Sequence, residues 1–590
     1  MPQRIIKPTG STAALRRLRG WYVVMLLVAT VFILRAFYLQ VIRYDYYKNA
    51  ALTSQLKQYQ IPATRGLIEA HDGDNVVPLV LNQTLYTLFA DPKYIKNAPQ
   101  VAQKVANIIG GNANDYAKLM TAKSRYVILA NKLSQSQKDK IDGLGYKGLG
   151  SRAADYRIYP EGSLAAQLLG FVDDSGQGQY GLEQALNSQL AGKPGMLKAI
   201  TDAQGVPLVA NKNNVNIQPV PGKTIVTSID VSMQQQLEGI LKAGLDKAHS
   251  KTGDALIIDP NSGAIIAMAN YPSYDPATYY NVTNPSLFQN AAISSPLEVG
   301  SSMKPLTMAA ALNVGAITKN ETYYDPSHFL VDGFNITNIE EDGGPGVRSL
   351  ADILQLSLNT GATWMLMQMG GGQINQKARD TWHDYMVNHF MFGKPTGIEQ
   401  GYEEGGSIPD PDHGYGLDLQ YANTAFGQGM TATPLQMGAA LSAVVNGGTY
   451  YKPTLLSAIG NGSQMTAQKP TVVRRGVVEP TVSQTIQQFM EYTFTKNHVL
   501  YGMPESLDAY NIGGKTGTAQ IANPAGGYYD DKFNGTFIGF VGGDQPQYVI
   551  VTRVDQPNIG GYAGSMAAAP IFSAAARMLI NNFNVVPKSQ

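Results

Sequence analysis

One long apolar stretch near the start of the chain limits what this protein can fold into. Residues 21–42 read WYVVMLLVATVFILRAFYLQVI, close to the ~20 residues that an α-helix needs to cross a bilayer. The one charged residue in it, Arg35, lies near the far end, where its long side chain can reach the membrane interface. The stretch therefore predicts a single membrane-spanning helix.

The charges before this stretch orient the helix. All of them are basic, and they are Arg4, Lys7, Arg16, Arg17 and Arg19. Because basic flanks stay in the cytoplasm, residues 1–20 are predicted to form a cytoplasmic tail and residues 21–42 a retained single-pass anchor. No small-x-small cleavage site follows, which argues against a cleaved signal peptide. Everything after about residue 42 is therefore predicted to be extracytoplasmic.

Composition excludes several kinds of chemistry. The chain has no cysteine, so disulfides, thiolate metal sites and cysteine nucleophiles are ruled out. Its 45 basic and 44 acidic residues leave a net charge of +1, without the basic surface that nucleic acids require. Neither a His-Glu-x-x-His helix nor a calcium-binding loop is evident, and no metal or cofactor is expected. Covalent catalysis would have to use Ser, Thr, Lys or a carboxylate.

A chain of 590 residues is too long for one hydrophobic core, so more than one domain is predicted. Residues 43–221 mix short strands, polar helices and glycine-rich turns, which predicts an elongated accessory domain, and residues 222–590 would form the main domain. Helices are predicted at 101–123, 232–249 and 565–579, and strands at 223–230, 255–259, 264–269, 535–543 and 547–555. The fold class is α+β, with an antiparallel sheet built from both ends of the main domain and flanked by helices.

The segment Ser301-Ser302-Met303-Lys304-Pro305 carries the first candidate for catalysis. Proline is tolerated in the first turn of a helix, so a helix is predicted to start at Ser301 or Ser302. Ser301 would then lie at the positive end of the helix dipole, with Lys304 one turn further along the same face. A desolvated, neutral Lys304 amine is able to take the proton of the Ser301 hydroxyl.

A Ser-x-x-Lys pair alone is weak evidence, because Ser54-Gln55-Leu56-Lys57 also fits it. By itself, Ser301 is equally consistent with an ordinary helix cap. Two further elements favour catalysis. Ser357-Leu358-Asn359 places a hydroxyl and a carboxamide at the edge of a helical segment. Lys515-Thr516-Gly517-Thr518 predicts a strand whose glycine lets a ligand backbone approach closely.

The Lys-Thr-Gly triplet also has a second copy, at Lys251-Thr252-Gly253, which precedes Ser301 and fits the turn that ends a helix. The ordered set of Ser301-x-x-Lys304, Ser357-x-Asn359 and Lys515-Thr516-Gly517 is the one found in penicillin-binding proteins and β-lactamases.

Nearly the whole chain resembles the class B penicillin-binding proteins of the division type. The segments that carry this resemblance are RGLIEAHDGD from Arg65, RIYPEGSLAAQLLGFV from Arg157, GLEQAL from Gly181, EVGSSMKP from Glu298 and FGQGMTATPLQM from Phe426. His71 stands where the family commonly has arginine, and Val299 replaces a common proline. The resemblance implies a non-catalytic pedestal, or dimerisation, domain at 43–221 and a transpeptidase domain at 222–590.

The resemblance also implies a reaction. Ser301 would attack the carbonyl between the two terminal D-alanines of a peptidoglycan stem peptide, and an amine of a neighbouring stem would resolve the acyl-enzyme. Lys304 would be the base, Ser357 with Lys515 a proton relay to the leaving group, and Asn359 a donor to the substrate amide. The N–H groups of Ser301 and Thr518 would form the oxyanion hole, and Thr516 with Lys515 would hold the substrate carboxylate beside Gly517.

By the same resemblance, β-lactams would acylate Ser301. Lipid-linked precursors, a SEDS-type membrane glycosyltransferase and division proteins would be partners, and the expected role is septal wall synthesis. Lateral-wall elongation, a penicillin sensor and a non-catalytic scaffold are the alternatives. A DD-carboxypeptidase, a β-lactamase, a Ser-His-Asp hydrolase and a bifunctional class A enzyme have less support, because the chain has no recognisable deacylating Glu motif, triad or glycosyltransferase domain.

Overall fold

The computed structural model describes residues 12–47, 56–200, 215–338, 344–462, 464–505 and 507–589. The chain divides into two compact units, Met1–Ala63 with Lys193–Pro221, and Thr64–Gly192 with Gly222–Gln590. The early Ser-x-x-Lys match begins at Ser54, which lies outside the described residues.

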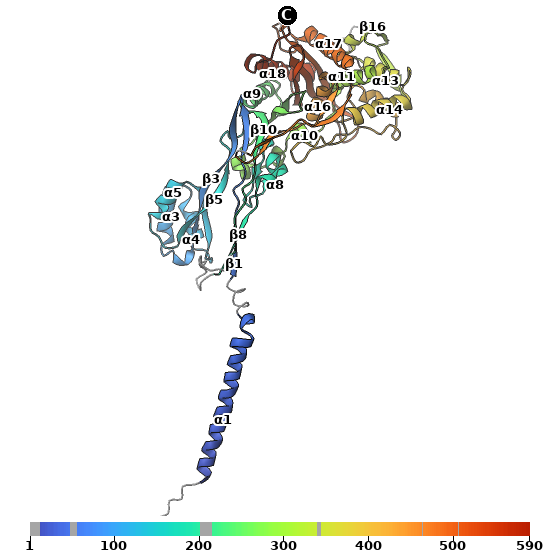
Figure 1. Cartoon of the computed structure of the whole chain (residues 1–590). Helices are drawn as coiled ribbons and strands as arrows, with labels where there is room; N and C mark the ends of the chain where they lie inside the picture. The colour runs from blue at the N-terminus through green and yellow to red at the C-terminus, as the bar shows by residue number, and fades with distance from the viewer. Residues whose placement is uncertain are drawn as a thin grey trace, which may run out of the picture. The chain divides into compact units, whose positions relative to one another are not determined.

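The first unit contains the predicted membrane helix. Helix α1 spans Thr12–Phe37 and continues into a π-helical turn, η1, at Tyr38–Ile42 (Figure 1). Leu15–Ile42 is long and apolar enough to cross a membrane, and its apolar side chains are exposed, as expected for a surface that faces lipid. A three-stranded antiparallel sheet completes this unit, in the order β1 (Leu56–Ile61), β8 (Gly195–Ile200) and β9 (Val215–Ile217).

The second unit contains a seven-stranded sheet to which both halves of the chain contribute. Its strands run β19-β18-β10-β2-β3-β4, and β5 pairs with β3. They are β2 (Ile68–Asp72), β3 (Asn75–Ala90), β4 (Val127–Leu133), β5 (Leu149–Ile158), β10 (Thr224–Asp230), β18 (Leu456–Gly460) and β19 (Thr466–Ala467). Since β10 pairs in parallel with β2 and antiparallel with β18, this sheet joins the accessory segment to the main domain.

A small lobe with its own core is attached to β3. It is formed by helices α3 (Ala98–Ile109), α4 (Ala113–Met120) and α5 (Gln135–Asp142). The single helix predicted at 101–123 is wrong, because Gly110 and Gly111 adopt φ of +79° and +84° and end α3. The short turn η2 (Pro92–Tyr94) leads from β3 into α3. After β5 come α6 (Ala166–Leu169), β6 (Phe171–Val172), β7 (Gly178–Gln179), α7 (Gly181–Ala185) and α8 (Asn187–Leu190).

The main domain is built on a five-stranded antiparallel sheet in the order β12-β11-β23-β22-β21. The strands are β11 (Thr252–Ile258), β12 (Ile265–Tyr271), β21 (Asn511–Ala522), β22 (Tyr528–Gly542) and β23 (Pro546–Asp555). They come from both ends of the domain, so the predicted α+β fold is confirmed. The second Lys-Thr-Gly triplet enters β11 rather than ending a helix, since Thr252 and Gly253 already pair with β23.

Alternation along the strands divides the apolar side chains between two cores. Ala255 and Ile257 of β11 join one core, whereas Leu256 and Ile258 join the other. Helices α9 (Val231–Lys247) and α18 (Ala569–Asn582) cover the first face, and α10 (Ala291–Ser294), α11 (Lys304–Asn313) and α16 (Pro434–Val445) cover the second (Figure 1). Asp230 caps α9 by accepting a hydrogen bond from Met233 N at 2.8 Å.

The other elements of the main domain surround these layers. The helices are α12 (Leu350–Gln355), α13 (Asn359–Met369), α14 (Gln376–Asp384), α15 (Leu417–Thr424) and α17 (Pro480–Asn497). Short helical turns occur at η3 (Pro276–Asn281), η4 (Pro285–Phe288), η5 (Gly300–Met303), η7 (Tyr385–His389) and η8 (Gly564–Ala568). Three strand pairs are β13 (Thr322–Asp325) with β16 (Gly346–Ser349), β14 (His328–Val331) with β15 (Phe334–Thr337), and β17 (Thr449–Tyr451) with β20 (Val472–Arg475).

Candidate active site

The turn that presents Ser301 is fixed by Gly300, the residue before it. Gly300 has φ of +58°, and a Cβ there would lie 2.6 Å from the Thr518 carbonyl oxygen. Gly300 N donates to Gly427 O at 3.0 Å, which ties the turn to a second loop. The α-helix starts at Lys304 rather than at Ser301 or Ser302 as predicted, since η5 at Gly300–Met303 is a 3₁₀ turn. Ser301 therefore lies on a tight turn just before α11.

Lys304 extends from the first residue of α11 into a buried position. Its Nζ donates to the Ser357 carbonyl oxygen at 2.5 Å, to Ser357 Oγ at 3.2 Å and to Asn359 Oδ1 at 2.8 Å. The residue has no exposed surface, so its amine is held by protein oxygens instead of water. The predicted Ser-x-x-Lys and Ser-x-Asn elements thus meet at this amine.

Ser357 lies on the connection between α12 and α13 in a strained conformation. Its φ of +59° falls in the left-handed region, which costs a serine roughly 1 kcal/mol or more. Leu358 anchors the connection because it is fully buried and donates its N–H to Ile353 O at 3.0 Å. Asn359 starts α13 and donates from Nδ2 to Thr337 O at 3.0 Å. The strain is held by the surrounding packing and aims the Ser357 hydroxyl at the two lysines.

Lys515 approaches the same hydroxyl from β21. Its Nζ donates to Ser357 Oγ at 3.0 Å, and to Thr516 O and Oγ1 at 3.0 and 3.1 Å. Burial of the ammonium lowers the pKa of Lys515 to about 7. An amine with this pKa changes its charge near neutral pH, which an exposed lysine does not.

The edge strand β21 forms one wall of the site. A Cβ on Gly517 would lie 2.2 Å from Thr536 Oγ1 and 2.3 Å from Val299 O, so only glycine lets β21 pack against the Ser301 turn. The Thr518 hydroxyl accepts a hydrogen bond from Gly564 N at 3.0 Å. Because β21 is the last strand of its sheet, one side of its backbone is available to an extended ligand.

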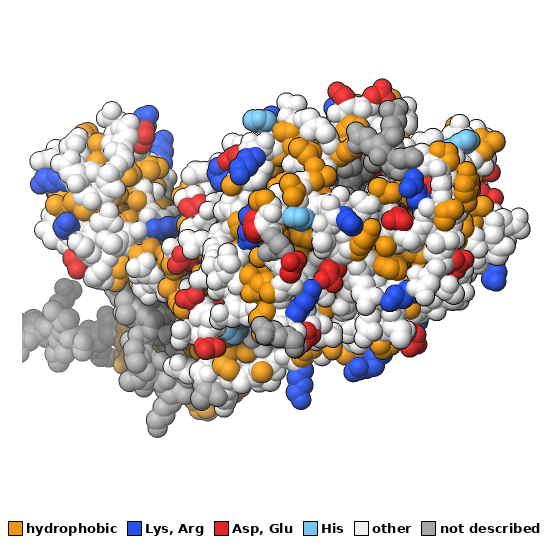
Figure 2. Space-filling model, turned by 90° about the horizontal axis from the view of Figure 1, so that it is seen from above, with side chains coloured by type: hydrophobic (Ala, Val, Ile, Leu, Met, Phe, Trp, Pro, Cys, Tyr) orange, Lys and Arg blue, Asp and Glu red, His pale blue; other side chains and the backbone are white. Residues whose placement is uncertain are grey.

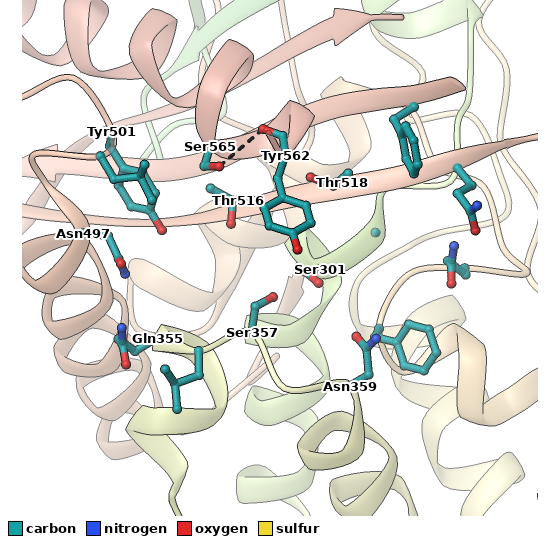
Figure 3. Close-up of a pocket in the computed structure, with 17 residues that line it drawn as sticks. Ser301, Gln355, Ser357, Asn359, Asn497, Tyr501, Thr516, Thr518, Tyr562 and Ser565 are labelled. Carbon is teal, nitrogen blue, oxygen red and sulfur yellow. Dashed lines mark hydrogen bonds between the residues drawn. The ribbon is translucent and has the colours of Figure 1, made fainter. Parts of the chain in front are cut away.

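A cavity of about 450 Å³ opens above these groups. Ser301, Ser357, Asn359, Thr516 and Thr518 all line it, as Figure 3 shows. Lys304 and Lys515 are buried beside it, and Gly517 faces the Ser301 turn. All eight residues singled out in the sequence are therefore brought together around one cavity.

Several lining residues have no recognisable sequence signal. Gln355, Asn497, Tyr501 and Tyr562 point toward the cavity from three separate segments, since Tyr501 follows Asn497 by one turn (Figure 3). Burial raises the pKa of Tyr501 to about 12, and its hydroxyl bonds with Thr516. Phe426 and Gln428 belong to the FGQG segment, which the resemblance had pointed out without assigning it to the site.

The surface charge agrees with the composition. On the face seen in Figure 2, Lys and Arg side chains are interspersed with Asp and Glu, and apolar side chains lie between them. Within the described ranges, His, Asp and Glu side chains form no group of three or more that would suit a metal ion.

Comparisons with known proteins cover both halves of the chain. The family described as "Penicillin binding protein transpeptidase domain" matches residues 253–577, and the one described as "Penicillin-binding Protein dimerisation domain" matches residues 60–227. Stage V sporulation protein D of Bacillus subtilis is 30% identical over 522 residues, which are 87% of this chain and 78% of that protein.

Two further similarities extend these matches. The peptidoglycan D,D-transpeptidase FtsI of Escherichia coli K12 is 26% identical over 570 residues, 95% of this chain and 91% of that protein. The crystal structure of penicillin-binding protein 3 from Mycobacterium tuberculosis in complex with aztreonam matches with a TM-score of 0.67 and 25% identity. That match covers 90% of this chain and 98% of the other.

Proposed function

This chain belongs to the class B penicillin-binding proteins, and on that premise we propose that Ser301 is the nucleophile with which it cross-links peptidoglycan. The family makes it a single-pass membrane enzyme of the peptidoglycan D,D-transpeptidase class. The substrate is the stem peptide of peptidoglycan, and the bond that breaks joins its two terminal D-alanines.

The observation that carries the proposal is the position of Ser357 Oγ between two amines. It accepts from Lys304 Nζ at 3.2 Å and from Lys515 Nζ at 3.0 Å. Such a chain of groups moves a proton without water. Lys304 takes the Ser301 proton as Oγ attacks, and Ser357 with Lys515 returns a proton to the departing D-alanine nitrogen.

The first half of the reaction ends in an ester. As Ser301 Oγ bonds to the substrate carbonyl carbon, the N–H groups of Ser301 and Thr518 stabilise the negative oxygen. The C–N bond then breaks and D-alanine leaves. In the second half, an amine of a neighbouring stem attacks the ester carbonyl and gives its proton to Lys515 through Ser357. Lys304 returns its proton to Ser301 Oγ as the ester C–O bond breaks, which restores the free enzyme.

The remaining site residues bind the substrate. Thr516 and the Lys515 ammonium hold its carboxylate, and Gly517 lets its backbone lie along the edge of β21. The Asn359 carboxamide fixes Lys304 through Oδ1 and donates one Nδ2 hydrogen to Thr337 O. The second Nδ2 hydrogen is the donor to the substrate amide.

β-Lactams are expected to acylate Ser301 as mimics of this substrate. The test is intact-mass measurement of the full chain in detergent after incubation with benzylpenicillin, followed by peptide mapping. A stable adduct on Ser301 that disappears in Ser301→Ala supports the proposal. An adduct elsewhere, or none at all, contradicts it and leaves the scaffold role as the leading alternative.

The cellular setting is also part of the proposal. We infer a cytoplasmic tail at 1–20, an anchor at 21–42 in the cytoplasmic membrane, a pedestal at 43–221 and an extracytoplasmic transpeptidase domain at 222–590. Glycan polymerisation would come from a SEDS-type glycosyltransferase. Similarity to FtsI favours work at the septum with division proteins, and a tagged copy that follows only the side wall would overturn this.

A further inference from the structure

A carboxylate close to the nucleophile has no part in the chemistry above. Glu298 lies three residues before Ser301 and is partly buried. Its Oε1 accepts two hydrogen bonds, from Gly429 N at 3.0 Å and from the Tyr528 hydroxyl at 2.9 Å. Its Oε2 is buried and has no hydrogen-bond partner among the residues that the structure describes.

This arrangement is costly for a carboxylate. A buried oxygen without a partner loses its hydration and gains nothing in return. Burial therefore raises the pKa of Glu298, while the Gly429 N–H and the Tyr528 hydroxyl act in the opposite direction. The two hydrogen bonds that Oε1 accepts offset this cost of burying the carboxylate.

Both bonds lead to walls of the cavity. Gly429 follows Gln428, which lines the cavity beside Phe426. Tyr528 is the first residue of β22 and pairs with Ala522, the last residue of β21, so it holds the turn end of the β21–β22 hairpin. Inside this end, Gln520 pairs with Phe533, and both line the cavity.

We propose that Glu298 is a positioning residue, whose carboxylate latches the β21–β22 hairpin to the Ser301 turn through the Tyr528 hydroxyl. The latch holds Gln520 and Phe533 over the cavity while the substrate is bound beside β21. This inference rests on the proposed acylation of Ser301. No atom of Glu298 takes part in a bond that forms or breaks, so its loss slows acylation without changing the product.

The test compares acylation of the full chain in detergent by a fluorescent penicillin. Tyr528→Phe removes only the hydroxyl, and Tyr528 is 38% exposed, so the variant is expected to fold. Loss of a hydrogen bond to a charged group should lower the second-order acylation rate about tenfold. Tyr529→Phe is the matched control, because Tyr529 is its neighbour on the same strand and makes no bond to Glu298.

A double-mutant cycle that combines Tyr528→Phe with Glu298→Gln tests whether these two side chains act through the bond between them. If the latch is one bond, Tyr528→Phe adds little to the loss caused by Glu298→Gln, and both variants still give one adduct on Ser301. Fully additive losses, or equal effects of Tyr528→Phe and Tyr529→Phe, would overturn the proposal.

The pH dependence is a second readout that general loss of stability would not produce. The side chain that faces the Glu298 carboxyl is Tyr528, and burial together with the Glu298 charge raises the pKa of this tyrosine, so it remains a donor. As pH falls through the raised pKa of Glu298, the advantage of the wild type over Tyr528→Phe should shrink. If the ratio of the wild-type acylation rate to the Tyr528→Phe rate stayed constant from pH 4.5 to 8, the latch would be contradicted. Absence of any Ser301 adduct in the wild type would refute the proposed function instead.

Discussion

The charge of Lys515 should make catalysis and stability respond to pH in opposite directions. Burial lowers its pKa from 10.5 to about 7. At 1.36 kcal/mol for each pH unit, this corresponds to roughly 5 kcal/mol against the charged form in the folded protein. At pH 6 about nine molecules in ten would carry the ammonium, and at pH 8.5 only about one in thirty.

Acylation by a ligand with a carboxylate should therefore fall as pH rises through about 7. The free enzyme loses the ammonium that attracts the carboxylate, and the second-order rate constant approaches a tenfold fall for each pH unit. Stopped-flow acylation with benzylpenicillin between pH 6 and 9 measures this. Lys515→Arg, which stays charged throughout, should lack the basic limb even if it is slower. A flat wild-type profile would refute the reasoning.

Stability should change the other way. Between pH 7 and 10.5 the unfolded chain binds a proton at this lysine and the folded protein does not, so the free energy of unfolding rises with pH. Relative to Lys515→Gln, the wild type should gain about 2 kcal/mol between pH 7 and 9. Urea unfolding of both proteins at the two pH values gives the difference, and parallel changes would show that Lys515 is not desolvated.

Two other substitutions test the packing around the site. Gly517→Ala places a Cβ 2.2 Å from Thr536 Oγ1 and forces the Val299–Ser301 turn to move. A shift of about 1 Å in this turn should slow acylation about 100-fold. An acylation rate within twofold of the wild type would contradict this. Arg553→Met removes the buried partner of Asp254, whose pKa of about 6 leaves it ionised at pH 8. Urea unfolding should show a loss of about 3–5 kcal/mol at pH 8 and less at pH 5, and a loss below about 1 kcal/mol at pH 8 would count against the pair.

The sheet could be predicted from the sequence because alternation of apolar residues is a local signal. The runs at 255–259 and 264–269 correspond to the hairpin of β11 and β12. The run at 535–543 overlaps β22 up to Gly542, and 547–555 lies within β23. Element ends were less predictable. Gly110 and Gly111 divide the helix predicted at 101–123, and the turn at Gly300 delays α11 to Lys304, because left-handed glycines end or redirect helices.

The site could be predicted as a set of residues but not as a geometry. Motif order pointed to Ser301, Ser357 and Lys515, which lie far apart in the chain. The left-handed Ser357, the burial of Lys515 and the bond between Glu298 and Tyr528 depend on contacts between distant segments. Residues such as Tyr528 carry no motif, because their role comes from strand register and from what the neighbouring loop presents.

The two lysines explain together how this site can act as both base and acid. Their Nζ atoms lie within 3.2 and 3.0 Å of one oxygen, so they are no more than about 6 Å apart. At that distance and an effective dielectric constant near 20, two positive charges repel each other by about 3 kcal/mol. Repulsion of this size disfavours the state in which both amines are protonated. In the proposed reaction, a neutral Lys304 amine takes the Ser301 proton while the Lys515 ammonium holds the proton that the leaving group needs, and Ser357 connects the two.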